Sequence, residues 1–327
     1  MKIFITGGDG FLGSNLVREL LSRGHELTLL IQENRQVKTL EGLNIKRVYG
    51  DVLNYESLVN GAKGAEVVIH AAASTSNWPS RSEIVNKINI EGTSNIIKMV
   101  KELGIKKLVY VGTANSFGFG DKENPGNETK PYGSLKYKMD YMDSKYKAQL
   151  LVLDAVKEGL LATIVNPTFM IGPYDSNPNT GEMILAIHAK EIPICSPGGR
   201  CFIHVRDAAV GISNAIEKGR IGECYILGNE NLNYKEIFAK MAKVVGVKPP
   251  TVVVPCFLVL IYGKLIQFFA DLFHKKPKVT YSQAKISCDE HFFSAKKAIE
   301  ELDLPQTPIE IAIEESFNWL NENGYVK

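Results

Sequence analysis

A short apolar run that leads through a glycine-rich turn into a helical pattern constrains the fold of this chain more than any other feature. Lys2–Thr6 has the β-branched and aromatic composition of a strand. Apolar residues then recur at helical spacing, at Leu12, Leu16, Val17, Leu20 and Leu21. Between strand and helix, Gly8, Gly10 and Gly13 have the spacing G-x-G-x-x-G, which lets a backbone approach a pyrophosphate at a helix amino terminus. This segment therefore predicts a strand, turn and helix that bind a dinucleotide.

The alternation of strand and helix continues over the first two-thirds of the chain. Short β-branched runs predict strands at Leu27–Ile31, Lys46–Val48, Val67–His70, Lys107–Val111 and Ala162–Val165. Helical patterns such as Ile90–Leu103 separate these runs, and this order is typical of a parallel sheet covered by helices. We therefore expect an α/β fold with a Rossmann-type, doubly wound parallel sheet and a smaller, mainly helical C-terminal domain that binds the substrate.

The regular alternation weakens after Pro173, where the substrate-binding part is expected to begin. Cys201–His204 and Glu223–Leu227 have the composition of strands that return to the large sheet. We therefore predict a dinucleotide-binding domain from residues 1–172 plus about 201–228. A discontinuous substrate domain would consist of residues from about 173–200 plus 229–327.

The composition excludes several classes of protein. Of 327 residues, 45% are hydrophobic and 23% are charged, as in ordinary soluble globular proteins. The 38 basic residues nearly balance the 36 acidic ones, so we expect no nucleic-acid partner. The five cysteines are scattered and form no C-x-x-C pair, which favours reduced thiols, and no metal site is predicted. The N-terminus lacks the apolar region of a signal peptide, so a cytoplasmic location is expected.

The octet Thr6-Gly7-Gly8-Asp9-Gly10-Phe11-Leu12-Gly13 resembles the cofactor turn of the extended short-chain dehydrogenase/reductase family, also called the NAD-dependent epimerase/dehydratase family. In that resemblance Gly7, Gly10 and Gly13 are the three family glycines. Further segments match in order, and the match covers nearly the whole chain: Gly50-Asp51-Val52, His70-Ala71-Ala72-Ala73, Asn89-Ile90-Glu91-Gly92-Thr93 and Asn166-Pro167-Thr168 with the residues up to Pro173. The resemblance implies that the cofactor contacts are Gly7, Gly10, Phe11, Leu12, Gly13, Asp51, Val52, Ala71, Ala72, Ala73, Asn89, Asn166, Pro167 and Thr168, together with the catalytic Tyr141 and Lys145. Asp51 could instead only cap the next helix, and His70 is assigned no chemistry.

A tyrosine and a lysine lie one helical turn apart in the segment Lys138–Lys157. Tyr141 and Lys145 are therefore on the same helix face. An ammonium beside a phenol lowers a phenolic pKa that is otherwise about 10, and it can also bond the nicotinamide ribose. Tyr137 offers a competing register, but the match to the family's Tyr-x-x-Ser-Lys-x-x-Ala-Glu helix selects Tyr141. The resemblance places the third catalytic residue, a hydroxyl that holds the substrate oxygen, at Thr113, with Ser116 as the alternative.

The residues around this constellation favour carbonyl reduction. Dehydratases of the family place acidic residues directly after the catalytic hydroxyl, and this chain has Ala114-Asn115 there. Asn166-Pro167-Thr168, followed by the apolar Phe169-Met170-Ile171, resembles the dihydroflavonol-reductase-like branch. We therefore predict a reductase for a small, partly apolar carbonyl substrate, with Trp78, Asn115, Phe117 and Phe119 as substrate-contact candidates. The alternatives are a sugar-nucleotide epimerase and a dinucleotide-sensing regulator without catalysis.

The end of the second expected strand bears on cofactor choice. Glu33 lies twenty residues after Gly13, the distance at which an acid often binds the ribose hydroxyls of NAD. It lies beyond the strand end, however, so that Ile31 or Gln32 occupies the discriminating position and Arg35 can meet a 2′-phosphate. We therefore include Gln32 and Arg35 in the cofactor site and predict NADP(H) over NAD(H).

An apolar stretch covers residues 252–273 and approaches the length of a membrane span. Pro255, Lys264 and Asp271 interrupt it. We therefore predict a buried or interface helix in a soluble enzyme. Peripheral contact with a membrane through residues 252–273 is the alternative, and a homodimer is left open.

Overall fold

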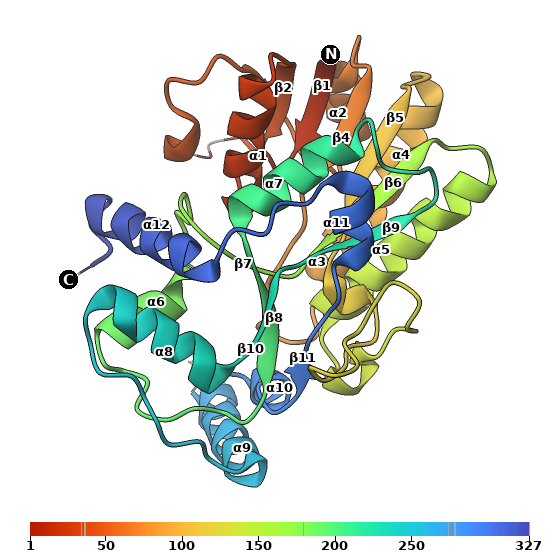
Figure 1. The fold of residues 1–327 in the computed structure, drawn as a ribbon. Coiled ribbons are helices and arrows are strands. Elements are labelled where there is room, and N and C mark those ends of the chain that lie inside the picture. The colour runs from red at the N-terminus through yellow and green to blue at the C-terminus, as the bar shows by residue number, and fades with distance from the viewer. Residues whose placement is uncertain (34, 36, 179, 274, 278, 327) are drawn as a thin grey trace.

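The large parallel sheet forms the centre of the molecule. The structure, a computed structural model, describes residues 1–33, 35, 37–178, 180–273, 275–277 and 279–326. Within these residues, seven strands pair in the order β3-β2-β1-β4-β5-β6-β9 (Figure 1). They are β1 (Lys2–Thr6), β2 (Glu26–Ile31), β3 (Lys46–Tyr49), β4 (Val67–His70), β5 (Lys107–Val111), β6 (Ala162–Pro167) and β9 (Cys224–Leu227). The order reverses between β1 and β4, which is the doubly wound arrangement expected from the sequence.

Helices cover both faces of this sheet (Figure 1). One face packs against α1 (Phe11–Ser22), α7 (Val205–Ala215) and α11 (Lys296–Leu302). The other packs against α2 (Tyr55–Ala62), α4 (Gly92–Glu102) and α5 (Asp140–Lys157). Aliphatic strand residues such as Ile5 and Val109 are fully buried between the layers, as parallel strands require. This packing holds the large sheet rigidly, and the glycine turn and the residues after β4 and β5 all lie at its carboxyl edge.

A second, smaller sheet lies below that edge (Figure 1). It consists of β7 (Phe169–Ile171), β8 (Gly199–His204), β10 (Glu230–Asn233) and β11 (Glu290–His291). Three helices pack around it: α6 (Gly181–His188), α8 (Tyr234–Val245) and α12 (Ile309–Glu322). The expectation that Cys201–His204 returns to the large sheet is therefore wrong, whereas the expected strand Glu223–Leu227 does join it as β9. The proposed domain boundaries themselves stay a prediction.

The apolar segment forms α9 (Cys256–Leu272), which packs beside α10 (Tyr281–Ile286) and projects from the lower end of the molecule (Figure 1). Within α9 only Gly263 and Ala270 are buried, so α9 is not a buried helix of the described chain, and the other form of the expectation, an interface helix, stays a prediction. Among the described residues, no helix is long and apolar enough to cross a membrane. The structure also joins Cys256 to Cys288 in a disulfide, which corrects the expectation that all five cysteines are reduced.

Candidate active site

The glycine-rich turn between β1 and α1 is shaped as an anion cradle. Gly7 has φ +75°, and a Cβ there would lie 2.5 Å from the backbone nitrogen of Ala72. A Cβ at Gly13 would lie 2.0 Å from the carbonyl oxygen of Gly7. Gly10, in contrast, is the N-cap of α1, and its Cβ would meet only the Gly7 oxygen at 3.5 Å. Gly7 and Gly13 thus permit the turn, while Gly10 leaves space at the helix amino terminus, which fits a dinucleotide pyrophosphate.

Because Gly13 permits the turn and Gly10 leaves space for the ligand, alanine at the two positions should have different effects. Gly13→Ala is expected to lower the free energy of unfolding by about 3 kcal/mol or more, because its methyl group overlaps the turn backbone. Gly10→Ala should leave stability nearly unchanged, because φ −80° suits alanine, yet weaken dinucleotide binding roughly tenfold or more. Urea unfolding and dinucleotide fluorescence titration measure the two effects. A Gly10→Ala protein that binds the dinucleotide as tightly as wild type would contradict the cradle.

The residues expected at the adenosine end lie together beyond β2 and β3. Gln32 Nε2 donates to Asp51 Oδ2 at 2.8 Å, and Asp51 Oδ1 accepts the backbone N–H of Leu53 at 2.8 Å. Arg35 Nε lies 2.9 Å from Asp9 Oδ2, so an arginine from the segment after β2 is held beside the glycine turn. Asp51 does not cap α2, because Asn54 does that. The alternative that Asp51 is only a helix cap is therefore not supported by this geometry.

Tyr141 and Thr113 approach each other at the carboxyl edge of the large sheet. Thr113 follows β5, Tyr141 lies in the first turn of α5, and the Thr113 side chain lies close enough to Tyr141 to lower its pKa. The hydroxyl of Ser116 is buried and has no hydrogen-bond partner in the described part of the chain, which favours Thr113 as the catalytic hydroxyl. Burial raises the pKa of Tyr141, and the nearby Thr113 side chain and the charge of Arg200 offset only part of this rise.

Lys145 lies one turn further along α5 and is 3% exposed. Its Nζ donates to the carbonyl oxygen of Val111 at 2.7 Å and lies 4.5 Å from the centre of the Tyr110 ring. Burial lowers the pKa of Lys145 to about 7. The sequence predicts that the Lys145 ammonium lowers the pKa of Tyr141. In the structure this lysine instead binds the end of β5, and the pKa of Tyr141 is raised.

The buried side-chain amides of Asn89 and Asn166 hold α5, the helix that carries Tyr141 and Lys145, in place. Asn89 lies in a single π-helical turn, η2 (Lys87–Glu91), and its Nδ2 donates to Ser144 Oγ and to the Ser74 carbonyl at 2.9 and 3.0 Å. Asn166 Nδ2 donates to the Thr113 carbonyl at 3.1 Å and to Gln149 Oε1 at 2.7 Å. These bonds fix α5 against the loops after β4 and β5. The sequence does not predict the roles of Ser144 and Gln149. Its only indication is their position on the helix, because Ser144 precedes Lys145 directly and Gln149 lies four residues after it.

The small residues after β4 face the glycine turn, as the sequence pattern requires. Ala71 donates its N–H to the Thr6 carbonyl at 3.0 Å, and Ala72 contacts the position of Gly7. His70 is buried between the hydroxyls of Thr6 and Thr93, at 2.7 and 3.2 Å. Burial, together with the charge of Lys145, lowers the pKa of His70 to about 3, so it is a neutral packing residue at physiological pH.

The wall opposite α5 comes from the smaller sheet. Arg200 on β8 lies close enough to Tyr141 to lower its pKa, and its guanidinium lies 5.0 Å from the centre of the Phe169 ring. Phe119 stacks on His291 with ring centres 4.0 Å apart. Arg200 was not predicted as a site residue, because its strand was expected in the large sheet. Among the substrate candidates, Trp78, Asn115 and Phe119 are half-buried, whereas Phe117 is a core residue.

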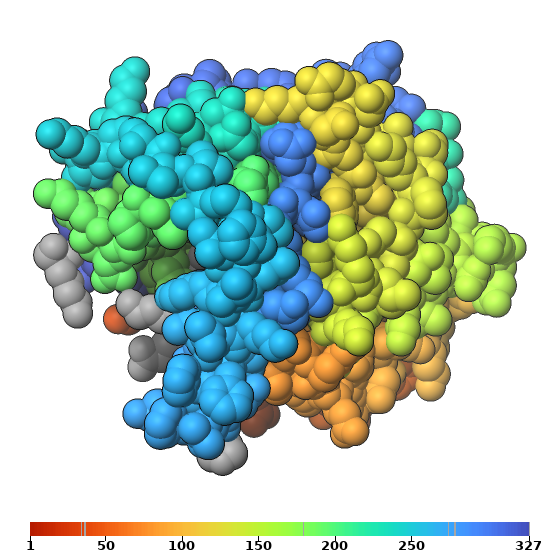
Figure 2. Space-filling model, turned by 90° about the horizontal axis from the view of Figure 1, so that it is seen from below, coloured from red at the N-terminus to blue at the C-terminus, as the bar shows by residue number. Residues whose placement is uncertain are grey.

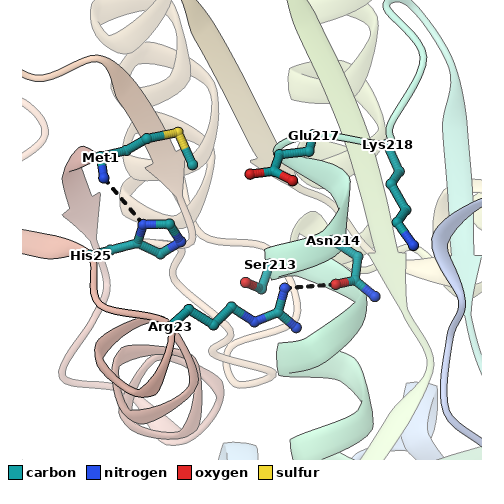
Figure 3. Close-up of a pocket in the computed structure, with 7 residues that line it drawn as sticks. All are labelled: Met1, Arg23, His25, Ser213, Asn214, Glu217 and Lys218. Atoms are coloured by element: carbon teal, nitrogen blue, oxygen red, sulfur yellow. Dashed lines mark hydrogen bonds between the residues drawn. The ribbon is translucent and has the colours of Figure 1, made fainter.

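A cavity of about 380 Å³ lies at the opposite, amino-terminal edge of the large sheet (Figure 3). It is lined by Met1, Arg23, His25, Ser213, Asn214, Glu217 and Lys218, and Arg23 donates to Asn214 across it at 2.7 Å. Met1 precedes β1 and His25 precedes β2, so the cavity is separated from Thr113 and Tyr141 by the length of the strands. We therefore locate the candidate site at the carboxyl edge, where parallel α/β sheets bind ligands.

Comparison with known proteins gives one family. The sequence model of the NAD dependent epimerase/dehydratase family matches residues 3–228. A protein of Synechocystis sp. named "Putative dihydroflavonol 4-reductase" is 33% identical over 99% of this chain and 96% of its own length. A 2-alkyl-3-oxoalkanoate reductase of Shewanella oneidensis is 28% identical over 88% of this chain and 78% of its own. The crystal structure of gox2253 superposes with a TM-score of 0.88 and 33% identity over 99% of both chains.

Proposed function

Because the chain belongs to the NAD-dependent epimerase/dehydratase family, we propose that it is a nicotinamide-dinucleotide-dependent reductase of a small, partly apolar carbonyl compound. The observation that supports this most is the placement of Thr113, Tyr141 and Lys145 at the sheet edge that also carries the glycine cradle. A non-catalytic, dinucleotide-sensing protein would have no need for a phenol beside a hydroxyl at this place. The bound dinucleotide supplies the hydride.

Residues of the protein then position the substrate oxygen and protonate it. Thr113 holds the carbonyl oxygen beside Tyr141, and the phenol donates its proton to that oxygen as the alcohol forms. The raised pKa of Tyr141 keeps the phenol protonated at neutral pH, which suits a proton donor in the direction of reduction. Lys145 holds the Val111 carbonyl and so fixes the end of β5, from which Thr113 follows two residues later. Thr113 and Lys145 are buried, which strengthens the hydrogen bonds that they make.

Reduction is favoured over epimerisation by the apolar character of the site wall and by the relatives. Phe169, Phe119 and Met142 lie around Tyr141 and Arg200. The Synechocystis and Shewanella relatives are both named as reductases. Epimerisation of a sugar nucleotide remains the second candidate function, because Arg200 beside Tyr141 could bind a substrate phosphate.

A turnover screen distinguishes these functions. The protein would be incubated with NADPH or NADH and a panel of 3-oxoacyl esters, flavanonols, aromatic aldehydes and nucleotide sugars. Absorbance at the nicotinamide band follows reduction, and chromatography of the sugars follows epimerisation. We expect net cofactor oxidation with an apolar ketone or aldehyde. Interconversion of nucleotide sugars without net oxidation would instead identify an epimerase, and binding without turnover of any compound would identify a sensor.

The preference for NADP(H) is a separate prediction and rests on Arg35. Its Nε is held by Asp9 beside the glycine turn, and an arginine fork is well suited to a phosphate. Arg35→Leu is expected to weaken NADPH binding roughly tenfold, which corresponds to about 1.4 kcal/mol, and to change NADH binding little. Titration of protein fluorescence with each dinucleotide measures both constants. Wild-type protein that binds NADH tenfold more tightly than NADPH would reverse the assignment.

A further inference from the structure

Helix α9 exposes an apolar face that the rest of the described chain does not cover. Phe257, Leu265 and Phe268 are 60%, 54% and 61% exposed. Further large apolar side chains are exposed on the helix and beside it, at Val252, Val253, Leu258, Ile261, Tyr262, Phe269, Leu272 and Phe273. Figure 2 shows the helix, in light blue, as a ridge on the face of the molecule seen from below. A continuous apolar surface of this kind marks an interaction site.

The helix has a defined inner face as well. Gly263 and Ala270, two turns apart, are its buried residues, and a Cβ on Gly263 would lie 2.5 Å from the Cβ of Ala284 on α10. The disulfide between Cys256 and Cys288 ties the first residue of α9 to the chain just after α10. The helix is therefore fastened to the protein along one side and presents the other outward, as a rigid element.

Lysines are concentrated in the segment of the sequence that contains α9. Between Glu236 and Asp289 the sequence contains eight lysines, and Asp271 is the one acidic residue. Lys248, Lys264, Lys275 and Lys276 are exposed. The whole chain has 38 basic and 36 acidic residues, so the remainder of the molecule is net negative. Exposed apolar and cationic side chains thus occur together in one segment of the chain, while the rest of the chain has more acidic than basic residues.

We propose that the exposed face of α9 and the lysines near it dock on an anionic lipid membrane. A helix that is held at the surface of a protein can lie in the plane of the headgroups with its exposed apolar side chains below them, while nearby lysines meet the lipid phosphates. A second copy of this chain fits less well, because an isologous contact would bring two lysine-rich surfaces together. An anionic membrane has an apolar interior for the exposed side chains of α9 and negative headgroups for the lysines.

The docking surface is one helix away from the candidate site. Ser282 on α10 donates to the Tyr137 carbonyl at 2.9 Å, and Ile286 packs with Tyr137, Met139 and Met142. Tyr141 packs against the same cluster. Docking through α9 therefore holds Tyr141 close to the lipid surface.

Vesicle co-sedimentation of the full-length protein tests the proposal. Vesicles of phosphatidylcholine with phosphatidylglycerol are compared with vesicles of phosphatidylcholine alone. We expect at least tenfold tighter binding to the anionic vesicles, and weaker binding as salt is raised. Phe257→Ser/Phe268→Ser should weaken binding tenfold or more, while the exposed control Leu161→Ser/Ile311→Ser should bind as wild type. Lys275→Glu/Lys276→Glu should lose the preference for anionic vesicles, while Lys46→Glu/Lys147→Glu should keep it.

Each variant is also titrated with the dinucleotide, and unchanged affinity shows that the fold is intact. Leu265→Ser is a second apolar variant that serves if the double variant does not fold. Absence of wild-type binding to anionic vesicles overturns the proposal, as does binding that the serine variants leave unchanged. If, in that case, light scattering shows a wild-type dimer that Phe257→Ser/Phe268→Ser turns into a monomer, the face belongs to a second copy of the chain.

Discussion

Replacing Tyr141 by phenylalanine is expected to lower turnover about 100-fold or more, because the substitution removes the proton donor and little else. The ring keeps its packing against the cluster of Met139, Met142 and Ile286, so the free energy of unfolding should change little. Dinucleotide affinity should remain near the wild-type value. Steady-state kinetics with a substrate from the screen, combined with dinucleotide titration, measures both quantities.

Two further variants sharpen this test. Tyr146→Phe removes a phenol from the same helix, where the ring stacks on Tyr132 with centres 4.3 Å apart, and should leave turnover unchanged. Thr113→Ala should lower turnover while the dinucleotide still binds, because its hydroxyl is assigned to the substrate oxygen and to Tyr141. A folded Tyr141→Phe protein that retains more than a third of wild-type turnover would rule out the phenol as the acid.

Lys145→Met is expected to damage turnover and cofactor binding together. The lysine holds the Val111 carbonyl at 2.7 Å, and its ammonium is the expected partner of the nicotinamide ribose. We expect turnover to fall about 100-fold and dinucleotide affinity about tenfold. Lys147→Met is the matched control, because Lys147 is exposed on another face of α5. Equal effects of the two substitutions would contradict the assignment of Lys145.

The same variant has a distinctive dependence of stability on pH. Burial lowers the pKa of Lys145 to about 7, whereas a lysine in the unfolded chain keeps a pKa near 10.5. Between these values the unfolded state binds more protons, so this lysine makes stability rise with pH. The cost of the buried charge is fully present below pH 7. The wild type should therefore gain up to a few kcal/mol relative to Lys145→Met between pH 7 and pH 10. Urea unfolding at several pH values measures this difference, and a constant difference would contradict it.

The large sheet could be predicted from the sequence because its signals are local. β1, β4 and β5 begin and end at the predicted residues, since each is a short buried run bounded by turn residues. The spacing of Tyr141 and Lys145 requires only a helix to place them together. The glycine turn likewise depends on backbone geometry within a few residues. Such patterns need no knowledge of distant parts of the chain.

Features that depend on distant pairing could not be predicted in this way. β8 has the composition of any buried strand, and nothing within it indicates that its neighbours are β7, β10 and β11. The position of Arg200 beside Tyr141 could not be predicted for that reason. Cys256 and Cys288 are separated by 32 residues, and only the packing of α10 on α9 brings them together. Helix α9 is apolar on nearly all sides, so its hydrophobicity alone does not show which face the protein covers.

Because the chain is synthesised from its N-terminus, β6 is made well before β9, the strand that pairs with its outer edge. The first six strands of the large sheet are complete once Pro167 has left the ribosome, but the free edge of β6 is covered only by Cys224–Leu227. In the interval the chain makes β7 and β8, and β8 in turn awaits Glu290–His291. A nascent chain of intermediate length thus carries unpaired backbone at two sheet edges, and such edges recruit other chains. Elongation through residues 168–290 is accordingly a period in which both sheets of this protein have unpaired edges.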